Sequence, residues 1–172
     1  LQPESLNSHF SLLNLEQIIE HNVGDIRNEE SLRQIFERVK PEVVFHLAAQ
    51  PLVKKSYDFP VETFDTNIIG STHLLECVRN SPSVKVCIFV TSDKCYLNRE
   101  TSTGYKEHDQ LGGHDPYSAS KAAAEIVFAS YNFSFFNSNE QLGAASVRAG
   151  NVIGGGDWSD NRIVPDCLRA LI

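Results

Sequence analysis

The run Val43-Val44-Phe45-His46-Leu47-Ala48-Ala49 determines the class of fold that this sequence can adopt. It is continuously apolar and rich in β-branched residues, and Pro41 and Pro51 leave too little room for a helix. Such a run is typical of a parallel strand buried on both faces. We therefore predict a buried parallel strand at this position.

Similar apolar runs and helical periodicity alternate along the rest of the chain. We predict further strands over 23–27, 84–91 and 142–149. We predict helices over 29–39, 60–79 and 116–131, a helix that begins at 163, and a short helix near 12–19. Alternating strands and helices predict an α/β fold with a doubly wound parallel sheet, and 172 residues are enough for one domain with a core.

Three polar stretches follow the predicted strands directly. They begin after Ala49, after Thr91 and after Ala149. Because ligands of an open α/β sheet bind at the carboxyl ends of its strands, we expect the chemistry at these three places.

The stretch Asp115-Pro116-Tyr117-Ser118-Ala119-Ser120-Lys121 predicts a helix start that carries a general base. Asp115 is a good N-cap, and Pro116 suits the first helical position. Tyr117 and Lys121 are four residues apart and therefore share one helix face. Lowering a tyrosine pKa from about 10 to about 7 takes roughly 4 kcal/mol, which is about what one cation at about 4 Å supplies. The alternative interpretation is a surface helix with a half-buried tyrosine.

Composition and charge exclude several classes of protein. A net charge of −7 argues against nucleic acid and against an anionic membrane surface as partners. No apolar run approaches the length that spans a bilayer. The four cysteines form no C-x-x-C pair, and the histidines show no metal-ligand spacing, so we predict no metal site and a reducing cytoplasm. Because the chain contains no methionine and ends inside a predicted helix, we expect a piece of a longer protein.

Five motifs in this order resemble the extended short-chain dehydrogenase/reductase superfamily. They are Gly24-Asp25-Ile26-Arg27, His46-Leu47-Ala48-Ala49-Gln50, Thr91-Ser92-Asp93, Tyr117-x-x-x-Lys121 and Arg148-Ala149-Gly150-Asn151-Val152. The resemblance implies a Rossmann-like sheet that is incomplete at the N-terminus, because no Gly-x-x-Gly-x-x-Gly turn is present to hold a pyrophosphate. Residues 1–172 would then be a partial NAD-binding domain, with the substrate-binding region starting near residue 150.

Within that superfamily, residues 91–96 are similar to the signature of the nucleotide-sugar 4,6-dehydratases. Lys94 stands where many of them carry glutamate. Lys94, the run 111–117 and the run 150–158 resemble the members that act on cytidine diphosphate-glucose. The resemblance implies an internal redox cycle in which NAD takes hydride from C4 of the sugar, water leaves across C5 and C6, and the hydride returns to C6.

The resemblance also assigns roles to individual residues. The implied catalytic residues are Ser92, Asp93, Lys94, Tyr117 and Lys121. The implied NAD-binding residues are Asp25, Ile26, Leu47, Ala48, Ala49, Asn67, Tyr117, Lys121 and Val152. The implied substrate-binding residues are Gln50, Ser92, Asn151 and Arg162. In these roles Asp93 would be the acid and Lys94 the base of the dehydration, each with a pKa shifted by burial. A homodimer is expected in the full-length protein, through the helices near 60–79 and 116–131.

Alternatives to several of these assignments stay open. An epimerase, or a dehydratase of dTDP- or GDP-sugars, would share Tyr117 and Lys121 but would not need Asp93 together with Lys94. The pair Asp93 and Lys94 could merely order the loop, and Arg162 could be a solvated charge at a helix start. A truncated, inactive chain is the alternative outside the enzymes.

Overall fold

The computed structural model describes residues 8–171, which fall into two compact units. One unit is Asp25–Gly150 and contains the sheet. The other combines residues up to Gly24 with those from Asn151 onward. In that second unit, the structure describes α1 (His9–Leu12), a 3₁₀ turn η1 (Leu15–Gln17) and α7 (Ile163–Leu171). The predicted helix near 12–19 is therefore replaced by two shorter turns, whereas the helix predicted to begin at Ile163 is confirmed.

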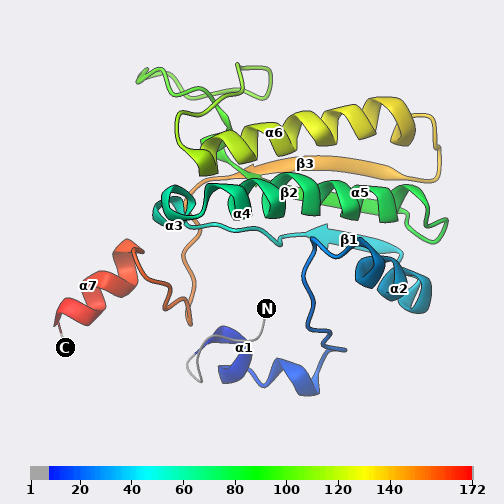
Figure 1. Cartoon of the computed structure of the whole chain (residues 1–172), viewed down its shortest axis with the longest axis horizontal. Helices are drawn as coiled ribbons and strands as arrows, with labels where there is room; N and C mark the ends of the chain where they lie inside the picture. The colour runs from blue at the N-terminus through cyan, green and yellow to red at the C-terminus, as the bar shows by residue number, and fades with distance from the viewer. Residues whose placement is uncertain (1–7, 172) are drawn as a thin grey trace. The chain divides into compact units, whose positions relative to one another are not determined.

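A three-stranded parallel sheet forms the centre of the Asp25–Gly150 unit (Figure 1). Its strands are β1 (Val43–His46), β2 (Val86–Ser92) and β3 (Gly143–Ala149), in the order β1-β2-β3. The register sets Thr91 beside Arg148 and Ser92 beside Ala149. The three main predicted strands are thus confirmed, and the carboxyl ends of β2 and β3 lie next to each other.

Helices follow each strand as predicted, and two further segments, α3 and η4, are added. The elements are α2 (Glu29–Val39), α3 (Val53–Asp58), α4 (Pro60–Phe64), α5 (Ser71–Arg79), α6 (Pro116–Tyr131) and a π-helical segment η4 (Asn132–Phe136). The predicted helix over 60–79 is a run of α4, a π-helical segment η2 (Asp65–Gly70) and α5. A π-segment inside a helix is frequently found at functional sites.

The core lies between the sheet and one layer of helices. It is built from β1, β2 and helices α2, α5 and α6, and the rings of Phe89 and Phe128 stack at 5.1 Å. The other face of the sheet is exposed in the described residues: Phe45 is 64% accessible and Val43 and Val147 are also exposed. Strand order explains why one face is covered. Right-handed crossovers that run β1-β2-β3 in one direction put the helices between these strands on the same face of the sheet.

The strand predicted over 23–27 does not form. The backbone N–H of Arg27 donates to Asp25 Oδ1 at 2.9 Å, which closes a turn at this point.

The long polar segment after β2 begins with a 3₁₀ turn, η3 (Asp93–Cys95), and Tyr96 then forms an antiparallel bridge with Leu111. No helix among residues 8–171 is long and apolar enough to cross a membrane.

Candidate active site

Tyr117 and Lys121 lie in the first two turns of α6, and both are buried. The start of α6 is capped as predicted, since the Ser118 N–H donates to Asp115 Oδ1 at 2.9 Å. Tyr117 is 8% exposed and Lys121 is 7% exposed. The alternative interpretation, a surface helix with a half-buried tyrosine, is therefore wrong.

The Lys121 ammonium occupies a site that disfavours its charge. Burial lowers the pKa of Lys121 below its ordinary value, and the charge of Glu125 one turn further along opposes part of that shift. On the β1 side, burial and the charge of Lys121 lower the pKa of His46 to about 4. His46 Nε2 lies 2.9 Å from Ser71 Oγ, and its ring packs on Phe89. A neutral, buried His46 agrees with the structural role that its lack of ligand spacing indicated.

A set of neutral polar groups holds the loop after β1 against α6. This amide network consists of Gln50, Thr63, Asn67 and Ser120. Asn67 Nδ2 donates to Ser120 Oγ at 2.8 Å and to the Gln50 carbonyl at 3.1 Å, while the Gln50 N–H donates to Asn67 Oδ1 at 2.8 Å. Ser120 Oγ in turn donates to the Tyr117 carbonyl at 2.7 Å. Asn67 thus connects the π-segment η2 to the turn of α6 that carries Tyr117 and Lys121.

Gln50 is a member of the amide network and its side chain points inward. Its Nε2 donates to Thr63 Oγ1 at 3.0 Å and to the Leu52 carbonyl, and its Oε1 accepts from the Leu52 N–H at 2.7 Å. The side chain is 6% exposed. This geometry favours a positioning role for Gln50 over the predicted substrate contact.

A second buried polar set surrounds Glu125 and contains full charges. This carboxylate network consists of Thr91, Glu125, Ser146 and Arg148. Glu125 is 3% exposed and accepts from Thr91 Oγ1, from Ser146 Oγ at 3.1 Å and from Arg148 Nη2 at 2.7 Å. The pairing with Glu125 raises the pKa of Arg148, so its guanidinium stays charged. The network joins α6 to β2 and β3 beside Lys121.

The predicted dehydration groups follow β2 on η3. Ser92 is buried, and its Oγ donates to Asp93 Oδ1 at 3.1 Å and accepts from the Lys94 N–H at 3.2 Å. Asp93 and Lys94 are both exposed among the described residues. No element of the described unit covers these two side chains, so their roles in the dehydration stay predictions.

Five of the predicted NAD-binding residues lie in the segments just before α2 and just after β1: Asp25, Ile26, Leu47, Ala48 and Ala49. Leu47 and Ala48 are exposed just after β1, and Ala49 is half-buried. Ile26 packs so closely on Gly70 that a Cβ there would lie 2.6 Å from Ile26 Cγ1. The carboxylate of Asp25 pairs with Arg27 at 2.6 Å. Small or exposed groups thus surround the end of β1.

Sequence comparison places this geometry in a family. Residues 5–139, most of the chain, match the family described as GDP-mannose 4,6 dehydratase. The chain belongs to this family. The CDP-glucose 4,6-dehydratase of Salmonella typhimurium is 50% identical over 175 residues, which cover 99% of this chain and 49% of that relative. The dTDP-D-glucose 4,6-dehydratase of Dictyostelium discoideum is 32% identical over 87% of this chain and 35% of its own length. The chain spans about half, or less, of these relatives.

Solved structures resemble this member of the GDP-mannose 4,6 dehydratase family closely. The UDP-glucose 4-epimerase of Thermus thermophilus in complex with NAD has a TM-score of 0.65 and 31% identity, covering 76% of this chain and 40% of that one. DesIV, a dTDP-glucose 4,6-dehydratase from Streptomyces venezuelae with NAD bound, has a TM-score of 0.76 over 93% of this chain and 48% of its own, and at 23% identity it shows the fold alone. The Rossmann-like fold and the extended short-chain dehydrogenase/reductase resemblance are confirmed.

Three of the predicted site residues of this family member lie in the other unit. Asn151 and Val152 are exposed there, and Arg162 is half-buried with a buried Nε that has no hydrogen-bond partner among the described residues. Their predicted contacts with substrate and cofactor stay predictions.

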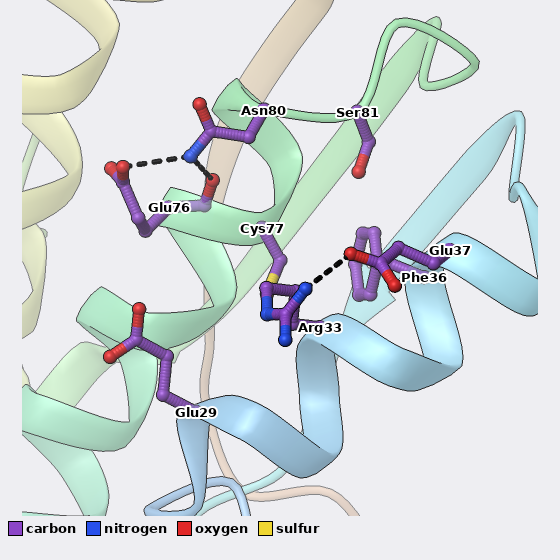
Figure 2. A pocket seen from close by; sticks show the side chains of 8 residues that line it. All are labelled: Glu29, Arg33, Phe36, Glu37, Glu76, Cys77, Asn80 and Ser81. Carbon is purple, nitrogen blue, oxygen red and sulfur yellow. Dashed lines mark hydrogen bonds and ion pairs between the residues drawn. The ribbon is translucent and has the colours of Figure 1, made fainter.

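A cavity of about 90 Å³ lies between α2 and α5, apart from the candidate site (Figure 2). Its lining residues are Glu29, Arg33, Phe36, Glu37, Glu76, Cys77, Asn80 and Ser81. Arg33 pairs with Glu37 along α2 at 2.5 Å with both side chains more than half exposed, and burial raises the pKa of the Cys77 thiol to about 11. A protonated thiol and an ion pair within one helix indicate a gap in helix packing.

Sequence reasoning missed Glu125, and gave Arg148 a place in a motif but no role. Glu125 interrupts an alanine-rich helix face one turn after Lys121. A charged residue at that place, with the strand residue Arg148 downstream, was the available signal. Ser56 was also missed: it is buried, and its Oγ accepts from the Tyr117 N–H at 3.2 Å.

Proposed function

We propose that the protein is a nucleotide-sugar 4,6-dehydratase that converts CDP-glucose to CDP-4-keto-6-deoxyglucose with NAD. The observation that carries the proposal is the 50% identity to a CDP-glucose 4,6-dehydratase over 99% of the chain. The buried Tyr117 and Lys121, one helical turn apart beside the carboxyl end of β2, supply the required acid–base group.

The residues at the end of β1 fit a dinucleotide. Ala48 and Ala49 have small side chains that let a flat ring approach the strand end, and Leu47 offers exposed apolar surface. Asp25 and Ile26 would flank the adenine, while Asn67 supports the lysine and Val152 would contact the nicotinamide. When bound, NAD supplies hydride acceptance at C4 and hydride return at C6.

Tyr117 would take the proton of the C4 hydroxyl. A tyrosine needs a fixed cation nearby to hold its phenolate form, and the Lys121 ammonium on the next turn is that cation. Lys121 would also hydrogen-bond the ribose next to the nicotinamide. Ser92, buried at the end of β2, would hold the C4 oxygen.

Asp93 and Lys94 would carry out the loss of water. Once C4 is a ketone, the C5 proton becomes acidic, so Lys94 as base and Asp93 as acid complete the elimination. Both side chains are exposed in the described unit and accessible to a substrate. Asn151 and Arg162 would bind the sugar diphosphate, for which a guanidinium has matching geometry.

A cytoplasmic homodimer is the proposed form of the protein. Exposed apolar side chains lie on α4, on α6 and on the residues that adjoin them: Val61 is 80% exposed, Phe133 83%, and Phe59 and Ile126 more than half. An exposed apolar surface of this kind is typical of a subunit interface.

The test is conversion of CDP-glucose by the protein with NAD, followed by mass spectrometry. We expect a product that has lost one molecule of water, and a rate about 10²- to 10⁴-fold lower for Tyr117→Phe. Tyr131→Phe is the matched control, because Tyr131 is a half-buried tyrosine on the same helix that bonds Glu76 away from the site. An unchanged substrate mass, or full activity of Tyr117→Phe, would contradict the proposal.

A further inference from the structure

We propose that Arg148 is a positioning residue that fixes the segment 96–112, here named the site loop, against β3 and α6. Through that loop it fixes η3, which carries Asp93 and Lys94, beside Tyr117. The effect on catalysis rests on the proposed function, whereas the effect on the loop does not.

One guanidinium contacts the site loop at two points far apart in the sequence. Arg148 Nη1 donates to the Tyr96 hydroxyl at 2.9 Å and to the Glu107 carbonyl at 2.9 Å. The same guanidinium lies over the Tyr96 ring, 4.9 Å from its centroid. Tyr96 is the first residue of the loop and Glu107 lies near its end. Arg148 therefore joins the two ends of the loop.

Arg148 can do this because its other side is held by a buried charge. Nη2 donates to Glu125 Oε2 at 2.7 Å, and Glu125 also accepts from Ser146 Oγ and Thr91 Oγ1. These partners come from α6, β3 and β2. One side of the guanidinium is therefore fixed to a carboxylate that bonds residues of two strands of the sheet, and its other side reaches the loop.

The ties within the site loop are mostly exposed to solvent. Its ends are joined by the Leu97 N–H to the Gln110 carbonyl and by the Gly112 N–H to the Cys95 carbonyl, both at 2.9 Å. Tyr105 stacks on Tyr96 at 5.0 Å and its hydroxyl accepts from the Arg99 N–H, but residues 98–107 are exposed. A loop held by exposed bonds opens easily, so a tie from the half-buried Arg148 has a large effect on its order.

The position of the catalytic pair follows from this tie. Tyr96 comes directly after η3, and Lys94 is two residues before it. A lysine at position 148 could not replace the arginine, because an ammonium lacks the planar fork that bonds Glu125, Tyr96 and Glu107 together.

Amide hydrogen exchange on Arg148→Lys tests the proposal without any substrate. We expect the Leu97 and Gly112 amides to exchange about tenfold faster or more, while core amides of α5 and β2 keep their protection. Arg79→Lys is the matched control: Arg79 also pairs with a glutamate and lies over an aromatic ring, Phe135, but it does not contact the loop. Unchanged loop exchange in Arg148→Lys, or equal acceleration of loop and core amides, would overturn the proposal.

Steady-state kinetics of the same variants with CDP-glucose test the catalytic consequence. We expect Arg148→Lys to lower kcat for water loss about 10- to 100-fold and to leave KM within about twofold. The loosened loop would displace Asp93 and Lys94, whereas the contacts to the nucleotide would stay in place. A KM change with unaltered kcat would overturn the catalytic part. If the wild type does not consume CDP-glucose, the proposed function fails, and hydrogen exchange still decides the role of Arg148.

Discussion

Two polar networks that both include a residue of α6 near Lys121 hold that helix with different chemistry. The amide network of Gln50, Thr63, Asn67 and Ser120 is neutral, and its members satisfy one another. The carboxylate network contains the ion pair of Glu125 and Arg148, with Thr91 and Ser146 filling the remaining positions on the carboxylate. A neutral network can lose a member and leave unpaired dipoles, whereas an ion pair that loses a member leaves a buried charge. The two sides of the site therefore differ in what a substitution costs.

The largest expected effect is the loss of one member of the ion pair. Arg148→Ala leaves the Glu125 carboxylate buried without its cation, and we expect the free energy of unfolding to fall by about 3–5 kcal/mol. Urea denaturation followed by circular dichroism measures it. The double variant Glu125→Leu with Arg148→Met should regain most of the loss, since it buries no charge. A double variant as unstable as the sum of two single losses would contradict the comparison.

Truncation in the amide network should cost less. Asn67→Ala leaves the Gln50 N–H and carbonyl without their partner, so we expect a loss of about 2–3 kcal/mol by the same denaturation. Asn80→Ala removes an asparagine that bonds Glu76 at the exposed end of α5, and should change stability by less than about 0.5 kcal/mol. If Asn67→Ala cost more than Arg148→Ala, charge would not be the difference between the networks.

The pH dependence of the free energy of unfolding tests the buried, neutral state of His46. Because the folded pKa of His46 is about 4 and the unfolded value is 6.5, the unfolded chain binds the extra proton as pH falls from 6.5 to 4. This group does not lower the free energy of unfolding above pH 6.5. Below pH 6.5 the free energy of unfolding falls, by about 2 kcal/mol between pH 7 and pH 5. His46→Gln should show a curve flatter by that amount. Parallel curves for the two proteins would refute the assignment.

We expect the smallest effect on the free energy of unfolding from an exposed ion pair, which serves as the reference for the buried one. Lys85 and Glu42 approach to 2.5 Å, but their side chains are 62% and 67% exposed. We expect Lys85→Ala to change the free energy of unfolding by less than about 0.5 kcal/mol, and the difference to vanish in high salt. A loss comparable to that of Arg148→Ala would mean that burial does not set the scale.

The sequence predicted well whatever depends on local pattern. Hydrophobic runs located the three strands, and the capping residue Asp115 marked the start of α6 correctly. Tyr117 and Lys121 were predicted on one helix face because their spacing is fixed by helical geometry. These features need no knowledge of which elements are neighbours.

Features that depend on packing between distant elements were not predicted. The bond between Glu125 and Arg148 exists because β3 returns beside α6, and the inward direction of Gln50 depends on Asn67 from η2. The exposure of Asp93 and Lys94 depends equally on what covers η3. A short strand at 23–27 was predicted from composition, but a strand needs a paired neighbour and the Asp25 side chain closes a turn instead.

The most direct test of the central claim, that Tyr117 and Lys121 serve a dehydratase, uses CDP-glucose labelled with deuterium at C4. The protein is incubated with this substrate and NAD, and the product is analysed by mass spectrometry and NMR. We predict loss of one molecule of water and deuterium in the C6 methyl group. Deuterium retained at C4 in a product that has lost no water would contradict the account and identify an epimerase instead.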